Sequence, residues 1–189
     1  MKTLLHTVLR TVQGWINRHT LRSSIANVRF LHHWEIQCFG ADGRLKWTEA
    51  FDNLVTNEGL NDILEKYWKG SGYSASHFVG LADGTPTFAA GDTMSSHAGW
   101  TEIQDYDEST RRTLTLGSVS GQSVDNTAAK ASFSINDSVT VGGAFIATSS
   151  TKGGTTGVLV AGAAFSGGDR ALLNGDTLAV SVTLTAASA

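Results

Sequence analysis

Six histidines and one cysteine are the side chains of this sequence best suited to metal binding or nucleophilic catalysis. His32 and His33 stand side by side in a segment with the alternating pattern of a β-strand. Neighbouring residues of a strand point to opposite faces of a sheet, so this pair cannot bind one metal ion together. His77 and His97 have no cysteine or carboxylate beside them at the spacing of a zinc site. The histidines therefore do not predict a metal centre.

Other short motifs also favour structural roles. The segment STKGGTTG at 150–157 lacks the Gly-Lys-Ser/Thr ending of a phosphate-binding loop and is typical of a hairpin turn. The segment DYDE at 105–108 lacks the spaced oxygen ligands of a calcium loop, and we interpret it as an acidic loop facing Arg111 and Arg112. No Gly-x-Ser-x-Gly or His-Glu-x-x-His motif occurs, and the lone Cys38 is expected to be a core residue. We expect neither enzymatic activity nor a cofactor or metal.

The elements that would position these residues are mostly β-strands. Only 16% of the 189 residues are charged, while 21 are glycine, a composition that suits sheets with tight turns. Alternation predicts a β-hairpin at 28–51 around the turn GADG. Further strands are predicted at 77–82, 113–119, 130–135, 139–147, 157–165 and 177–186. Short strands between polar turns favour a mainly β, antiparallel β-sandwich or jelly-roll-like domain.

One helix is predicted at 57–69, with Asn57 as the N-cap. Its apolar residues recur at helical spacing and are expected to pack on the sheet; they are Leu60, Ile63, Leu64, Tyr67 and Trp68. The stretch 83–112 has no clear period, which makes it a candidate surface loop for contacts.

The N-terminal segment differs from the rest in charge and period. Residues 1–50 carry seven Lys/Arg and three Asp/Glu, a net charge of +4, whereas residues 51–189 carry seven and fourteen, a net charge of −7. Residues 1–22 have the spacing of an amphipathic helix with an apolar stripe that includes Leu5, Leu9, Val12 and Ile16. We expect residues 1–27 to form an amphipathic helix that tethers the chain to a neighbouring subunit, with packing on its own sandwich as the alternative, and residues 28–189 to form the β-sandwich domain, containing the hairpin and the helix.

Two stretches resemble a known group of proteins. They are NLVTNEGLNDILEKYW with HFVGLADGT, and GDTMSSHAGWTEIQDYDESTRRTLTLG with the C-terminal segment from AFIATSS to VTLTA. Over roughly residues 53–186 the chain resembles small structural virion proteins of tailed, particularly short-tailed, bacteriophages. The resemblance implies a non-enzymatic β-sandwich protein present in many copies in the virion, as a tail- or fibre-attachment adaptor or a capsid-decorating component. It implies no catalytic residue.

The expected partners are other virion proteins (a portal or adaptor, a fibre, or the major capsid protein) and further copies of the chain. The candidate contact residues are Leu5, Leu9, Arg10, Val12, Ile16 and Arg18 in the tether, and Asp105, Asp107 and Glu108 in the acidic loop. The basic side chains of the tether suit an acidic neighbour. Nucleic acid is not expected, because no recognition motif is present and most of the chain is acidic.

Two alternatives remain open from sequence alone. A carbohydrate-binding β-sandwich would need exposed tryptophan rings, and the chain has five tryptophans. Exposure of Trp68 or Trp100 would favour this function. A peripheral membrane protein would use residues 1–22 as an interfacial helix, although the polar face of that segment has few charges.

Overall fold

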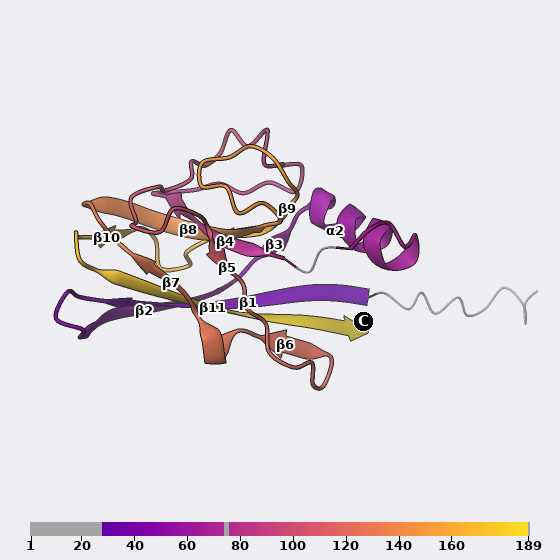
Figure 1. Cartoon of the computed structure of the whole chain (residues 1–189), viewed down its shortest axis with the longest axis horizontal. Coiled ribbons are helices and arrows are strands. Elements are labelled where there is room, and N and C mark those ends of the chain that lie inside the picture. Colours follow the sequence, from indigo (N-terminus) through magenta and orange to yellow (C-terminus); the bar gives the residue numbers. More distant parts are fainter. Residues whose placement is uncertain (1–27, 74–75, 189) are drawn as a thin grey trace, which may run out of the picture. The chain divides into compact units, whose positions relative to one another are not determined.

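The computed structural model describes residues 28–73 and 76–188, and its main compact unit is Arg29–Ala187. The expected helix at 1–22 and tether at 1–27 lie outside the described residues. The compact unit is mainly β and consists of two antiparallel sheets that enclose an apolar core (Figure 1). The antiparallel β-sandwich expected from the sequence is therefore confirmed.

The first sheet has the strand order β2-β1-β11-β6, and β7 also pairs with β11. These strands are β1 (Val28–Phe39), β2 (Leu45–Asp52), β6 (Ser123–Asp125), β7 (Ala131–Ser134) and β11 (Thr177–Ser188). The short 3-10 helix η2 (Thr127–Ala129) joins β6 to β7. The alternation predicted for the hairpin is present, because Trp34, Ile36 and Cys38 are fully buried while Glu35 and Gln37 between them are only partly buried. Trp34 pairs with Phe51 across the hairpin, and their rings stack.

The second sheet has the order β3-β9-β8-β4-β5, and β10 also pairs with β8. Its strands are β3 (Leu54–Val55), β4 (Phe78–Asp83), β5 (Arg112–Thr113), β8 (Val139–Ala147), β9 (Leu159–Ala164) and β10 (Arg170–Leu172). The strand predicted at 113–119 is largely absent, because the pairing of β5 with β4 ends at Thr113. The next residue, Leu114, is still buried in the core. The apolar residues that predicted a strand therefore include a core residue that lies outside any strand.

The stretch 83–112 is a packed cover rather than a free surface loop. Met94 and Trp100 are buried against Phe145 and Leu159 on the outer face of the second sheet. This explains why β8 is a nearly continuous apolar run, since both of its faces are covered. The sequence predicted a candidate surface loop for contacts here, because the buried residues of this stretch follow no regular period.

The helix consists of α2 (Asn57–Ile63) followed by the π-helical turn η1 (Leu64–Trp68). Its N-cap is Thr56, not the expected Asn57, since the Thr56 hydroxyl accepts a hydrogen bond from the Gly59 amide at 3.0 Å. Polar contacts tie this end to β9: the Thr56 hydroxyl donates to the Leu159 carbonyl, and the Glu58 carboxylate accepts from the Leu159 amide at 2.7 Å. A Cβ on Gly59 would lie 2.3 Å from the Val160 carbonyl oxygen, so glycine permits this close approach.

The expected packing of the helix through its apolar stripe is wrong for most of that stripe. Ile63 is partly buried, but Leu64, Tyr67 and Trp68 are 56%, 79% and 76% exposed. Two physical reasons account for the error. The helix is held to the sheet by its N-terminal polar groups and Gly59, and the i→i+5 hydrogen bond from the Lys69 amide to Leu64 widens the last turn. The 3.6-residue period on which the expected stripe depended ends at that turn.

Replacing Leu64 by alanine is therefore expected to lower the free energy of unfolding by less than about 1 kcal/mol, because the side chain is already more than half exposed. Leu81→Ala, at a fully buried position of β4, should cost about 2–5 kcal/mol and provides the comparison. Urea denaturation of both variants measures the difference. A loss of more than 2 kcal/mol in Leu64→Ala would show that the helix face is part of the core.

Candidate functional site

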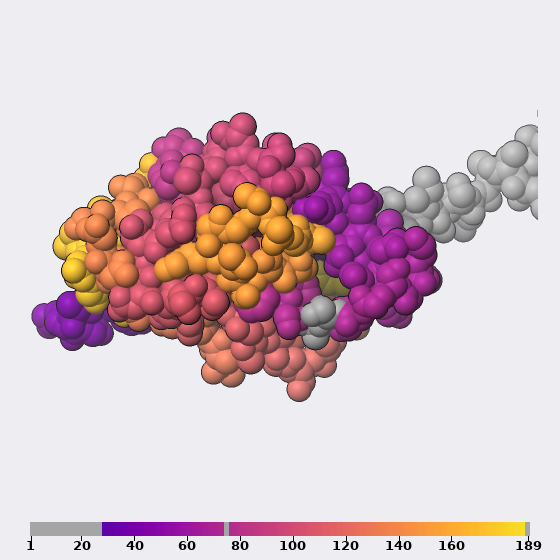
Figure 2. Space-filling model, turned by 45° about the horizontal axis from the view of Figure 1, so that its top comes forward, coloured from indigo at the N-terminus to yellow at the C-terminus, as the bar shows by residue number. Residues whose placement is uncertain are grey.

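A cleft of about 740 Å³ opens between the two sheets beside the helix. Part of the surface next to the helix is hollowed in Figure 2, where the helix is purple. Phe30, Val124 and Leu184 line the cleft from the first sheet. Ile63, Ile146 and Val160 line it from the helix and the second sheet. The cleft is thus assembled from segments that are far apart in the sequence, and no local pattern could have predicted it.

The chemistry of the cleft is apolar and uncharged. Within the described part of the chain, no Lys, Arg, Asp or Glu lines it, and its titratable side chains are His32, His77 and Tyr73. Burial lowers the pKa of His32 to about 4. The Asn53 side-chain amide donates to His32 Nδ1 at 2.9 Å, which leaves the ring proton on Nε2. This arrangement favours an uncharged apolar ligand surface and offers no charge to bind an ion.

The edge of the cleft combines exposed apolar side chains with a strained turn. Val119 and Tyr73 are 74% and 73% exposed although both line the cleft. Gly121 and Gln122 form the tip of a tight turn between Ser120 and Ser123, and both have positive φ, 56° and 62°. Glutamine seldom adopts this conformation, and such strain is concentrated at functional sites. The cleft edge is therefore the strongest candidate for a contact surface on this side of the protein.

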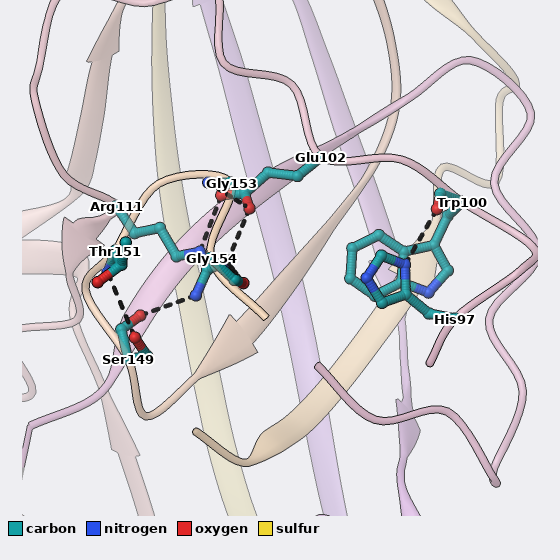
Figure 3. A network of polar contacts seen from close by, with 8 residues as sticks. All are labelled: His97, Trp100, Glu102, Arg111, Ser149, Thr151, Gly153 and Gly154. Atoms are coloured by element: carbon teal, nitrogen blue, oxygen red, sulfur yellow. Dashed lines mark hydrogen bonds and ion pairs between the residues drawn. The ribbon is translucent and has the colours of Figure 1, made fainter. Parts of the chain in front are cut away.

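A polar cluster around Arg111 has a structural role (Figure 3). Its guanidinium group is fully buried and forms two hydrogen bonds with the Glu102 carboxylate, at 2.8 and 2.7 Å. It also donates to the carbonyl oxygens of Ser149 and Gly154, while the Gly153 amide donates to Glu102. These contacts tie the cover 83–112 to the loop after β8.

The acidic loop faces different partners from those expected. Arg111 pairs with Glu102, not with the loop, and Tyr106 within the loop is buried. Glu108 accepts hydrogen bonds from Ser134 of β7. Asp107 accepts one from the Asn136 side chain, and Asp105 is exposed. Asp107 is exposed as well, whereas Glu108 is half-buried, so the carboxylates of Asp105 and Asp107 are the ones accessible to a partner.

The other candidate contact residues lie outside the described residues: Leu5, Leu9, Arg10, Val12, Ile16 and Arg18.

The remaining residues suited to chemistry are held apart. His32 is buried, whereas His33 on the opposite face is exposed and lies 2.9 Å from Asp52. His97 stacks on Trp100, as Figure 3 shows, and its Nδ1 lies 3.1 Å from the Trp100 carbonyl. Burial raises the pKa of the Cys38 thiol to about 11, so it is a poor nucleophile. Within residues 28–73 and 76–188, no three His, Cys, Asp or Glu side chains are grouped as metal ligands.

The two tryptophans that bear on sugar binding differ in exposure. Trp100 is 5% exposed and packs between Phe88 and Phe145, so it cannot form a sugar platform. Trp68 is open to solvent, contrary to the expectation from helical spacing. Among the described helices, none has the length and apolarity required to cross a bilayer.

No protein-family model matches this chain, and no curated protein matches it either. The resemblance to virion proteins therefore stays a prediction from the sequence motifs.

Proposed function

We propose that this chain is a non-enzymatic structural protein of a bacteriophage virion, present in many copies as a tail- or fibre-attachment adaptor or a capsid-decorating component. The observation that carries the proposal is the exposed apolar surface of the helix, formed by Leu60, Leu64, Tyr67 and Trp68, which we call the helix face. The sequence motifs described above supply the virion context. Assembly takes place in the host bacterium, and the finished protein resides in the particle.

The helix face has the composition of a protein contact. Tyr67 and Trp68 pack edge to face with ring centroids 5.4 Å apart, and both rings are largely exposed. Tryptophan and tyrosine dominate the binding energy of protein interfaces, and exposed apolar clusters mark interaction sites. Leu60 and Leu64, one turn apart in the same helix, are exposed as well. The partner that fits this mixed aromatic and aliphatic surface is another virion protein, a portal or adaptor, a fibre, or the major capsid protein.

The helix is also firmly placed for such a contact. Its first turn is hydrogen-bonded to β9 through Thr56 and Glu58, and Gly59 lies against the β9 backbone. These contacts fix the helix without using Leu64, Tyr67 or Trp68. The apolar side chains thus lie on a preformed helix that is hydrogen-bonded to the sheet, and a preformed helix loses less backbone entropy on binding.

The test compares Trp68→Ala and Leu64→Ser with Leu173→Ser. Leu173 follows β10 and is exposed to the same 56% as Leu64, so it is a matched control away from the helix. Each full-length variant is supplied to phage particles grown without the wild-type protein, and the copies per particle are measured by quantitative mass spectrometry. We expect the two helix variants to remain folded and their copy number to fall about ten-fold or more. Wild-type incorporation of both variants would overturn the proposal.

The exposure of Trp68 also favours a second candidate function, a carbohydrate-binding module in a receptor-contacting fibre part. Sugar rings stack on exposed aromatic rings, so Trp68→Ala would abolish glycan binding while Leu64→Ser would leave it intact. A protein contact over the helix face depends on both residues. Binding of the three variants to immobilised host surface glycans therefore separates the two functions.

A further inference from the structure

The cleft between the sheets is an apolar surface without an assigned ligand. Its lining is free of charged side chains in the described residues, and its volume of about 740 Å³ lies in the range of binding pockets. Val119 and Tyr73 leave large apolar areas exposed at its edge. Such a surface is suited to an apolar segment that can enter between the sheets.

The sequence of the chain itself contains a segment that matches this surface. In residues 1–22, Leu5, Leu9, Val12 and Ile16 recur at i, i+4, i+7 and i+11. This spacing is the one by which an amphipathic helix places anchors in an apolar groove. The four side chains are aliphatic and uncharged, as the lining requires.

The distribution of charge also supports binding of this segment in the cleft. The first 30 residues contain five Lys or Arg and no Asp or Glu, whereas the rest of the chain is acidic. The net charges of the N-terminal segment and of the rest of the chain are therefore opposite in sign and favour their association.

We propose that the cleft binds the Leu5–Leu9–Val12–Ile16 stripe of a second copy of this chain. This inference rests on the proposed function, because a protein that acts in many copies needs a contact that repeats. A stripe on one copy and a cleft on the next form a head-to-tail contact, which generates a ring or a filament. The segment of each copy then secures its neighbour.

The experiment uses two full-length variants that damage opposite sides of this contact. Val119→Arg places a large cation at the cleft edge, at a side chain already 74% exposed, so the fold is expected to persist. Leu9→Asp places a charge in the stripe. The controls are Leu45→Arg, at an exposed position of β2 outside the cleft lining, and Gln13→Asp, at a polar position of the same N-terminal segment.

Sedimentation velocity measures the association of each protein over a range of concentrations. We expect the wild type and both controls to associate, and each cleft or stripe variant to associate at least about ten-fold more weakly. Mixing Val119→Arg with Leu9→Asp should produce a one-to-one complex that grows no further, because one chain supplies an intact stripe and the other an intact cleft. This result requires that the stripe of one chain binds the cleft of another.

Two outcomes would overturn the inference. One is a wild-type chain that stays monomeric, which would mean that the segment occupies its own cleft or none. The other is wild-type association of either variant. In both cases, loss of virion incorporation in the helix-face variants would still support the proposed function. The cleft inference can therefore fail while the proposed function holds.

Discussion

Replacing Arg111 by methionine is expected to lower the free energy of unfolding by about 3–5 kcal/mol. The guanidinium group is the partner of the buried Glu102 carboxylate and satisfies the carbonyl groups of Ser149 and Gly154. Methionine fills similar space but leaves Glu102 with a buried charge and, among the residues that the structure describes, a single backbone amide donor, Gly153. Removal of one partner of a buried ion pair is costly because the remaining charge stays out of water. Urea denaturation at pH 7 measures the loss.

The double variant Arg111→Met, Glu102→Leu serves as the control. It removes both charges, so most of the stability lost in Arg111→Met should return. If the double variant is as unstable as the single one, the loss comes from the freed carbonyl groups and not from the unpaired carboxylate. A single variant that loses less than 1 kcal/mol would contradict the structural role assigned to Arg111.

The β-strands were predictable where one face is buried and the other is not. In β1 the even-numbered residues from His32 to Cys38 are buried. The residues between them are polar, so the sequence alternates in the same way as the burial. The run at 139–147 was predicted with the bounds of β8 because glycine, asparagine and serine turns delimit it. Short strands such as β3, β6 and β10 were missed, since two or three residues carry no periodic signal.

The environment of the helix depended on contacts that its period does not encode. Leu60, Leu64 and Trp68 have the spacing of a buried stripe, yet the helix is attached by a threonine cap, a glutamate and a glycine. The same ambiguity between core and interface applies to any apolar stripe, because both exclude water from similar side chains. Only the position of the helix relative to the sheet distinguishes them.

The cleft was beyond prediction for a different reason. Its walls come from β1, the helix, β8, β9 and β11, and the turn at Gln122 closes one edge. His32 was interpreted correctly as one face of a strand, but its place in the cleft depends on how the two sheets meet. Because His32 is buried in the cleft, its ring is harder to protonate, and this effect can be measured.

Acidification from pH 7 to pH 5 is expected to cost the wild type about 2 kcal/mol of stability through His32 alone. Burial lowers the pKa of this side chain in the folded protein to about 4, while in the unfolded chain the pKa stays near the ordinary histidine value of 6.5. Between these values the unfolded chain binds the extra proton, so stability falls as the pH falls through this window. The contribution is complete above about pH 6.5 and is lost as the pH approaches 4.

The variant His32→Phe isolates this effect, because it keeps an apolar ring in the cleft and removes the titrating group. Urea denaturation of both proteins at pH 7, 6 and 5 gives two stability curves. Carboxylates with a lowered pKa, such as Glu49 and Asp169, are present in both proteins and cancel in the difference between the curves. We expect the wild type to lose about 2 kcal/mol more than the variant over this range. Parallel curves would mean that His32 accepts a proton in the folded state, and that water and charge enter the cleft more readily than its apolar lining indicates.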